Sequence, residues 1–132
     1  MDPFRKQSMM LLGGLALQFL LGIFNTLFVE FPDTKDPNQL WEFAKTQVPL
    51  GLHILVGLGL LIGSTSLLYR AIKTKNSSWR NLAAVGLISL VTAFVSGALF
   101  ISTQNDQLSF LMAVGFIVAV ITYAWGIYSV KS

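Results

Sequence analysis

The chain alternates long apolar stretches with short polar segments. The apolar stretches cover residues 9–29, 49–69, 82–102 and 108–129. Each is close to the ~20 residues that a helix needs to cross the ~30 Å hydrocarbon layer of a membrane. The pattern therefore predicts four transmembrane helices in a single domain of residues 1–132, and a multi-pass protein whose first partner is the lipid bilayer.

The low content of charged residues supports this prediction. Charged side chains make up 11% of the chain, whereas ordinary soluble proteins carry ~25%. A soluble domain would have too few of them to cover four apolar helices. Because the connections after the second and third stretches are short, we expect consecutive helices to be antiparallel neighbours in an all-α, up-down-up-down four-helix bundle.

Lysine and arginine residues fall mainly in alternate connections. Seven of them precede the first stretch, lie between the second and third, or follow the fourth, whereas Lys35 and Lys45 lie in the segment 30–48. By the positive-inside rule, both termini are expected in the cytoplasm and the protein in the cell membrane. The net charge of +3 thus reflects topology. The cations flank helices and form no stripe with interleaved aromatic residues, so we expect no nucleic-acid partner.

The segment 30–48 is the only connection with room for structure of its own. Three prolines interrupt it or border it, and between them Leu40, Trp41 and Ala44 recur at helical spacing within residues 38–45. One expectation is a short helix in the headgroup region, where tryptophan is favoured. The alternative is an ordered loop that caps the bundle.

Small residues recur at regular spacing in all four predicted helices. Lipid provides no hydrophobic drive for helix association, so helices associate where small side chains let their backbones approach. We expect these stripes to be packing seams, or in one case a contact between copies in a homo-oligomer. They are Gly14, Gln18, Gly22 and Thr26 in the first helix, Gly59 and Gly63 in the second, Ser89, Ala93 and Gly97 in the third, and Gly115 and Ala119 in the fourth.

The predicted spans contain no Asp, Glu, Lys or Arg, and the chain has no cysteine. Proton-coupled transporters, ion pumps and voltage sensors normally keep such a residue inside the membrane. Motifs of metalloproteases, triad hydrolases and phosphate-binding loops are also missing. We therefore expect no catalytic residue and no metal site. The composition favours a binding or interaction component of the membrane, alone, as a homo-oligomer or within a larger complex.

His53 is the only histidine and lies about one turn from the outer end of the second helix. Asn25 and Met112 are expected at similar depth in the first and fourth helices. One interpretation is a haem- or quinone-associated redox site, in which His53 and Met112 would be axial ligands of haem. A second is structural, with His53 joining two helices through a hydrogen bond to Asn25 or to a backbone carbonyl. A third is a pH-sensing role.

Gln18 lies in the middle of the first predicted span, on its stripe of small residues. A buried amide in hydrocarbon needs hydrogen-bond partners, and Ser64, Thr92 and Thr122 lie at comparable depths. Gln18 would then hold helices together. The alternative is an oligomeric pore or carrier with a polar pathway. The side chains that would line such a pathway are Gln18, Asn25, Thr92 and Ser96.

Sequence runs near the helix starts carry a family resemblance. They are residues 17–22 (LQFLLG) followed by 25–29 (NTLFV) and Pro32, Leu52-His53 in the second helix, and residues 109–113 (SFLMA) in the fourth. Together they resemble a family of small four-helix integral membrane proteins of bacteria and archaea that has no assigned activity. More distantly, the QFLLG run and His53 are similar to one half of the haem A synthase bundle. That second resemblance implies a haem-binding role for His53 and carries no catalytic residue across.

Overall fold

The computed structural model describes residues 2–131, and this part of the chain contains five α-helices and no strand. The helices are α1 (Pro3–Phe28), α2 (Pro37–Thr46), α3 (Val48–Lys73), α4 (Ser77–Thr103) and α5 (Asp106–Ser129). By length and composition, α1, α3, α4 and α5 can each cross a membrane. The prediction of an all-helical protein with four candidate spans is confirmed.

The four long helices extend past the apolar stretches at their polar ends. α1 begins at Pro3 instead of residue 9, α3 continues to Lys73, and α4 begins at Ser77. Hydropathy marks only the part of a helix that suits hydrocarbon, whereas helix ends depend on capping. The side chains of Asp2 and Asn76 accept hydrogen bonds from backbone N–H groups at the starts of α1 and α4. The predicted bounds were therefore too narrow.

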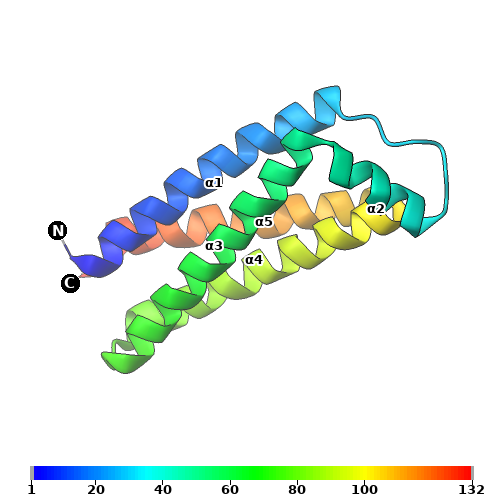
Figure 1. The fold of residues 1–132 in the computed structure, drawn as a ribbon. Helices are drawn as coiled ribbons and strands as arrows, with labels where there is room; N and C mark the ends of the chain where they lie inside the picture. The colour runs from blue at the N-terminus through cyan, green and yellow to red at the C-terminus, as the bar shows by residue number, and fades with distance from the viewer. Residues whose placement is uncertain (1, 132) are drawn as a thin grey trace.

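The long helices pack as a closed ring. α1 packs against α3 and α5, and α4 packs against α3 and, most extensively, against α5. The start of α1 and the end of α5 lie beside each other at one end of the molecule, and α2 lies at the opposite end (Figure 1). The buried apolar core between the helices includes Leu15, Leu60, Leu67 and Leu90.

Two large aromatic side chains fill the core in the half that contains the chain ends. Trp79 and Tyr123 have no exposed surface. Trp79 stacks on Phe4 with ring centroids 5.4 Å apart and lies against Gly126, while Tyr123 lies against Gly86. Glycine is required at these two contacts because a side chain there would occupy the space of the ring.

α2 covers the ends of α3 and α4 that face away from the termini. Its Leu40 and Ala44 are buried, and Ala44 packs in one cluster with Leu50 of α3. The indole Nε1 of Trp41 donates a hydrogen bond to Oγ of Ser102 in α4, at 2.8 Å. The structure thus has the short helix, and not the loop, between residues 30 and 48.

The stripes of small residues mark helix contacts in most, though not all, cases. A methyl group on Gly115 would lie 2.8 Å from the carbonyl oxygen of Ser89, so α4 and α5 meet along the predicted seam. On α3, however, Gly59 faces open space and Gly57 faces its neighbours. At 3.6 residues per turn, positions two apart point to nearly opposite sides of a helix. Within the described chain, the predicted seam on α3 holds at Gly63, which meets Leu11 of α1, and does not hold at Gly59.

Candidate binding site between α1 and α3

Three polar side chains lie in a row where α1 packs against α3. We call Gln18 and Asn25 of α1 and His53 of α3 the polar cluster. The Nε2 atoms of Gln18 and His53 are 3.4 Å apart, and Nδ2 of Asn25 donates to the carbonyl oxygen of Pro49 at 3.3 Å. These contacts join the two helices along the half of the bundle near α2.

Two glycines provide the space that the polar cluster occupies. A methyl group on Gly22 would lie 3.4 Å from Cε1 of His53, and one on Gly57 would lie 3.2 Å from Nε2 of Gln18. Phe94 of α4 borders the same place, since its ring lies 3.5 Å from that position on Gly57. The imidazole therefore packs against the α1 backbone, and the Gln18 amide reaches across α3 toward α4.

Each member of the polar cluster has one buried polar atom without a hydrogen-bond partner among residues 2–131. These atoms are Oε1 of Gln18, Oδ1 of Asn25 and Nδ1 of His53. An unpaired polar group away from water costs ~1–3 kcal/mol, and such groups in native proteins call for an explanation. Three of them in one seam give the cluster a capacity for hydrogen bonding that its helix contacts do not use.

The contact between Gln18 and His53 fixes which kinds of hydrogen bond remain free. An amide nitrogen donates only, so Nε2 of His53 accepts and the ring proton is on Nδ1. Of the three atoms without any partner, one is then a donor, Nδ1–H, and two are acceptors, the oxygens of Gln18 and Asn25. If the Gln18 amide is turned by 180°, donor and acceptor exchange places but both kinds remain. A hydroxyl group, which donates and accepts, fits either arrangement.

His53 and Met112 pack against different neighbours. Ligation of one haem iron by both residues would need the two side chains to face one metal position. His53 packs on α1 with Nε2 directed at Gln18, whereas the sulfur of Met112 packs against Gly97 of α4, 3.0 Å from where a methyl group on Gly97 would lie. Within residues 2–131, no three His, Cys, Asp or Glu side chains form a group that could hold a metal ion.

The partners expected for Gln18 have other contacts. Ser64 is buried and forms a hydrogen bond with the hydroxyl of Tyr123. The hydroxyls of Thr92 and Thr122 donate to carbonyl oxygens one turn earlier in their own helices. Gln18 therefore interacts with His53, a pairing that the sequence analysis did not consider, although both residues were singled out.

Of the side chains proposed to line a pathway, the polar cluster contains Gln18 and Asn25. Thr92 forms its hydrogen bond within α4, to the carbonyl oxygen of Ile88. Ser96 is 3% exposed and lies in the interior face of α4. The structure thus brings Gln18, Asn25 and His53 together and leaves Thr92 outside the group.

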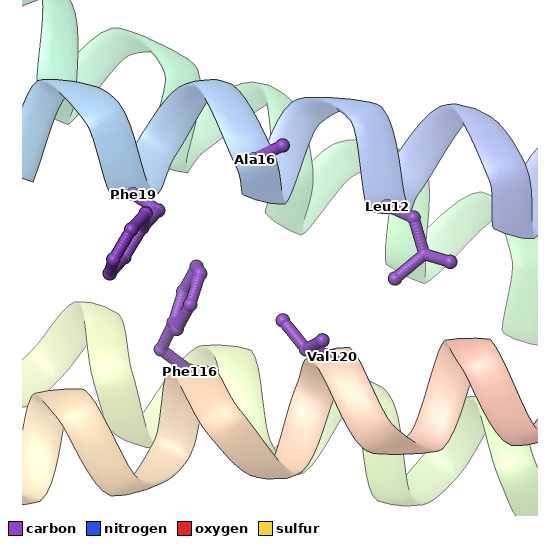
Figure 2. Close-up of a pocket in the computed structure, with 5 residues that line it drawn as sticks. All are labelled: Leu12, Ala16, Phe19, Phe116 and Val120. Carbon is purple, nitrogen blue, oxygen red and sulfur yellow. The ribbon is translucent and has the colours of Figure 1, made fainter.

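A groove between α1 and α5 has no counterpart in the sequence analysis. It has a volume of about 270 Å³ and is lined by Leu12, Ala16, Phe19, Phe116 and Val120. Figure 2 shows Phe19 and Phe116 facing each other at one end, with Leu12 and Val120 toward the other. Its lining is almost entirely apolar, so a site of this kind leaves no signal in a chain that is apolar throughout.

Comparison with protein-family models, with curated proteins and with solved structures finds no match to this chain. The family resemblances of residues 17–22 and 109–113 therefore remain interpretations of the sequence, and the geometry of the polar cluster is the basis for proposing a function.

Proposed function

We propose that this protein is a multi-pass component of the cell membrane that binds a lipophilic molecule carrying a hydroxyl group, with quinols as the first class to test. The observation that supports this proposal most directly is the polar cluster, in which three buried polar atoms have no hydrogen-bond partner within the described chain. A ligand hydroxyl can both donate and accept, which matches the two kinds of unpaired atom in the cluster. The proposed role is binding and orientation, in keeping with spans that contain no Asp, Glu, Lys or Arg.

The proposal includes an orientation. α1, α3, α4 and α5 cross the membrane up-down-up-down, the termini and the α3–α4 connection face the cytoplasm, and α2 lies in the outer headgroup region. The charge distribution supports this, because seven of the nine Lys and Arg residues fall on the cytoplasmic side in that arrangement.

Orientation can be tested by labelling, because the chain has no cysteine. Asp33→Cys before α2 and Ser78→Cys at the start of α4 each introduce a single thiol. In intact cells, a membrane-impermeant maleimide should label Asp33→Cys and should label Ser78→Cys only after lysis. The opposite pattern would place the termini outside.

Binding can be tested with an alkylhydroquinone and its dimethyl ether, which has the same ring and tail but no hydroxyl donor. In detergent micelles, the hydroquinone should raise the thermal unfolding midpoint of the protein and the ether should not. His53→Phe and Gln18→Leu should weaken hydroquinone binding about ten-fold, the factor for ~1.4 kcal/mol, which is within the range for losing one buried hydrogen-bond partner.

Thr92→Val is the matched control, because it removes a hydroxyl that bonds only within α4. It should bind the hydroquinone as the unmodified protein does. If the ether binds as well as the hydroquinone, or if His53→Phe binds as well as Thr92→Val, the polar cluster does not hold the hydroxyl and the proposal fails.

A further inference from the structure

The helices that line the α1–α5 groove carry a group of cations at the chain ends, and Arg5 lies seven residues before Leu12 at that end of the groove. Nη2 of Arg5 donates to the carbonyl oxygen of Val130 at 2.9 Å, which joins the start of α1 to the end of α5. Lys6 and Lys131 are exposed nearby in the chain, one residue after Arg5 and two residues after the end of α5. The apolar groove and these cations thus lie along the same pair of helices, with the cations nearer the chain ends.

These cations have little acidic compensation. Between residues 2 and 131 the one salt bridge joins Lys45 to Glu42, far from the chain ends in sequence. Asp2 is the single acid near them, and one of its oxygens caps α1 by accepting from Phe4. Nε of Arg5 is buried without a hydrogen-bond partner in the described chain. This end of the molecule therefore has a net positive charge and a donor left over.

The spacing along α1 matches one leaflet of a bilayer. Arg5 and Phe19 are fourteen residues apart, which at 1.5 Å per residue is about 21 Å. Half of a membrane, including its headgroup region, is ~20–22 Å thick. The Phe19–Phe116 stack, with ring centroids 5.9 Å apart, closes the groove at that depth. Ala16, between Leu12 and Phe19, contributes only a methyl group and leaves room for a chain.

We infer that this groove binds one anionic phospholipid of the leaflet that contains the chain ends. One acyl chain lies along the groove, and the phosphate lies among Arg5, Lys6 and Lys131. Acyl chains are the medium around the groove, so the apolar part alone would accept any lipid. The basic end distinguishes an anionic headgroup, as basic sites between transmembrane helices do. This site is separate from the polar cluster and stands independently of it.

The test places the protein in bilayers of unlabelled phosphatidylcholine. In separate samples, a trace of one spin-labelled lipid is added, either phosphatidylglycerol or phosphatidylcholine, each labelled on the acyl chain. Electron spin resonance gives the motionally restricted fraction of each lipid, and hence the ratio of their association constants with the protein. We expect phosphatidylglycerol to be favoured about five-fold per basic residue engaged. In 1 M salt the preference should collapse, because the Debye length falls to ~3 Å.

Two exposed lysines allow the charge argument to be tested without disturbing the fold. Lys6→Gln with Lys131→Gln should reduce the preference about 25-fold, which is five-fold for each lysine removed. Lys73→Gln with Lys75→Gln removes the same charge at the α3–α4 connection and should leave the preference for phosphatidylglycerol unchanged. An equal loss in both double variants would mean general attraction to a basic surface and would overturn the site.

The groove itself is tested by filling it. Ala16→Phe should lower the restricted fraction of phosphatidylglycerol to that of phosphatidylcholine. Val91→Phe adds the same ring on an outward-facing position of α4, where Val91 is 45% exposed, and should have no effect. Equal preference for phosphatidylglycerol in Ala16→Phe and Val91→Phe would show that no chain occupies the groove.

Discussion

The contact between Gly86 and Tyr123 makes a sharp prediction about stability. A methyl group on Gly86 would lie 2.5 Å from both Cζ and the hydroxyl oxygen of Tyr123, far inside van der Waals contact. The ring has no exposed surface into which it can move, and its hydroxyl is hydrogen-bonded to the buried Ser64. Gly86→Ala must therefore displace the ring, separate α4 from α5, or do both.

The size of the effect follows from three terms. Overpacking a filled core costs ~1–3 kcal/mol, and losing the hydrogen bond to Ser64 costs ~0.6 kcal/mol on the average for membrane proteins. Replacing glycine by alanine within a helix raises the free energy of unfolding by ~0.5–1 kcal/mol and offsets part of this loss. We expect Gly86→Ala to lower the free energy of unfolding by about 1–3 kcal/mol. The measurement is unfolding by SDS in mixed micelles, followed by circular dichroism.

The chain offers a matched control. Gly13 lies in α1 with nothing within 4 Å of its added methyl group, so Gly13→Ala should be neutral or slightly stabilising. In a double-mutant cycle, Tyr123→Leu should remove most of the penalty of Gly86→Ala, because the ring that clashes is gone. Unfolding midpoints of Gly86→Ala and Gly13→Ala that coincide would refute the packing described for this core.

Two further predictions concern other helix contacts. Trp41→Phe keeps an aromatic ring but loses the hydrogen bond to Ser102, which should lower the free energy of unfolding by ~1 kcal/mol. Limited proteolysis should then cleave the α1–α2 connection faster. Adding Ser102→Ala to Trp41→Phe should lower the stability little further. Gly115→Ala places a methyl group 2.8 Å from the backbone carbonyl of Ser89, which no rotamer change can relieve, so its SDS unfolding midpoint should fall well below that of Gly13→Ala. A Gly115→Ala protein as stable as Gly13→Ala would mean that α4 and α5 are less closely packed than described.

The spans were predictable because the bilayer imposes a length and a composition on every crossing helix. Nothing else in the fold had to be known to place helices at residues 9–29 or 108–129. The helix ends were less predictable, since α1 starts at Pro3 and α4 at Ser77 through capping by polar residues outside the apolar stretches.

The contacts inside the bundle were harder to predict than the spans. In a soluble helix the polar face shows which side turns outward, but α3 is apolar around its circumference, so its rotation had no such marker. Gly59 and Gly63 were predicted as contact positions, and the structure uses Gly63 and also Gly57. The same uncertainty explains why the contact of His53 with Gln18 was not among the interpretations of His53.

The packing of α1 connects the polar cluster to its proposed role. Only 11% of the most apolar window of α1 is buried, against 28% for α3 and for α4, and its buried residues, Phe4 to Leu15, all lie in the half near the chain ends. Beyond Leu15, the hydrogen bonds that hold α1 to α3 are those of Gln18 and Asn25. Since little apolar surface would be exposed by parting the two helices there, this half of α1 belongs to the low-stability end of the structure. Under the proposed function, a ligand hydroxyl would reach the unpaired atoms of the polar cluster by entering between α1 and α3 while the core around Tyr123 stays closed.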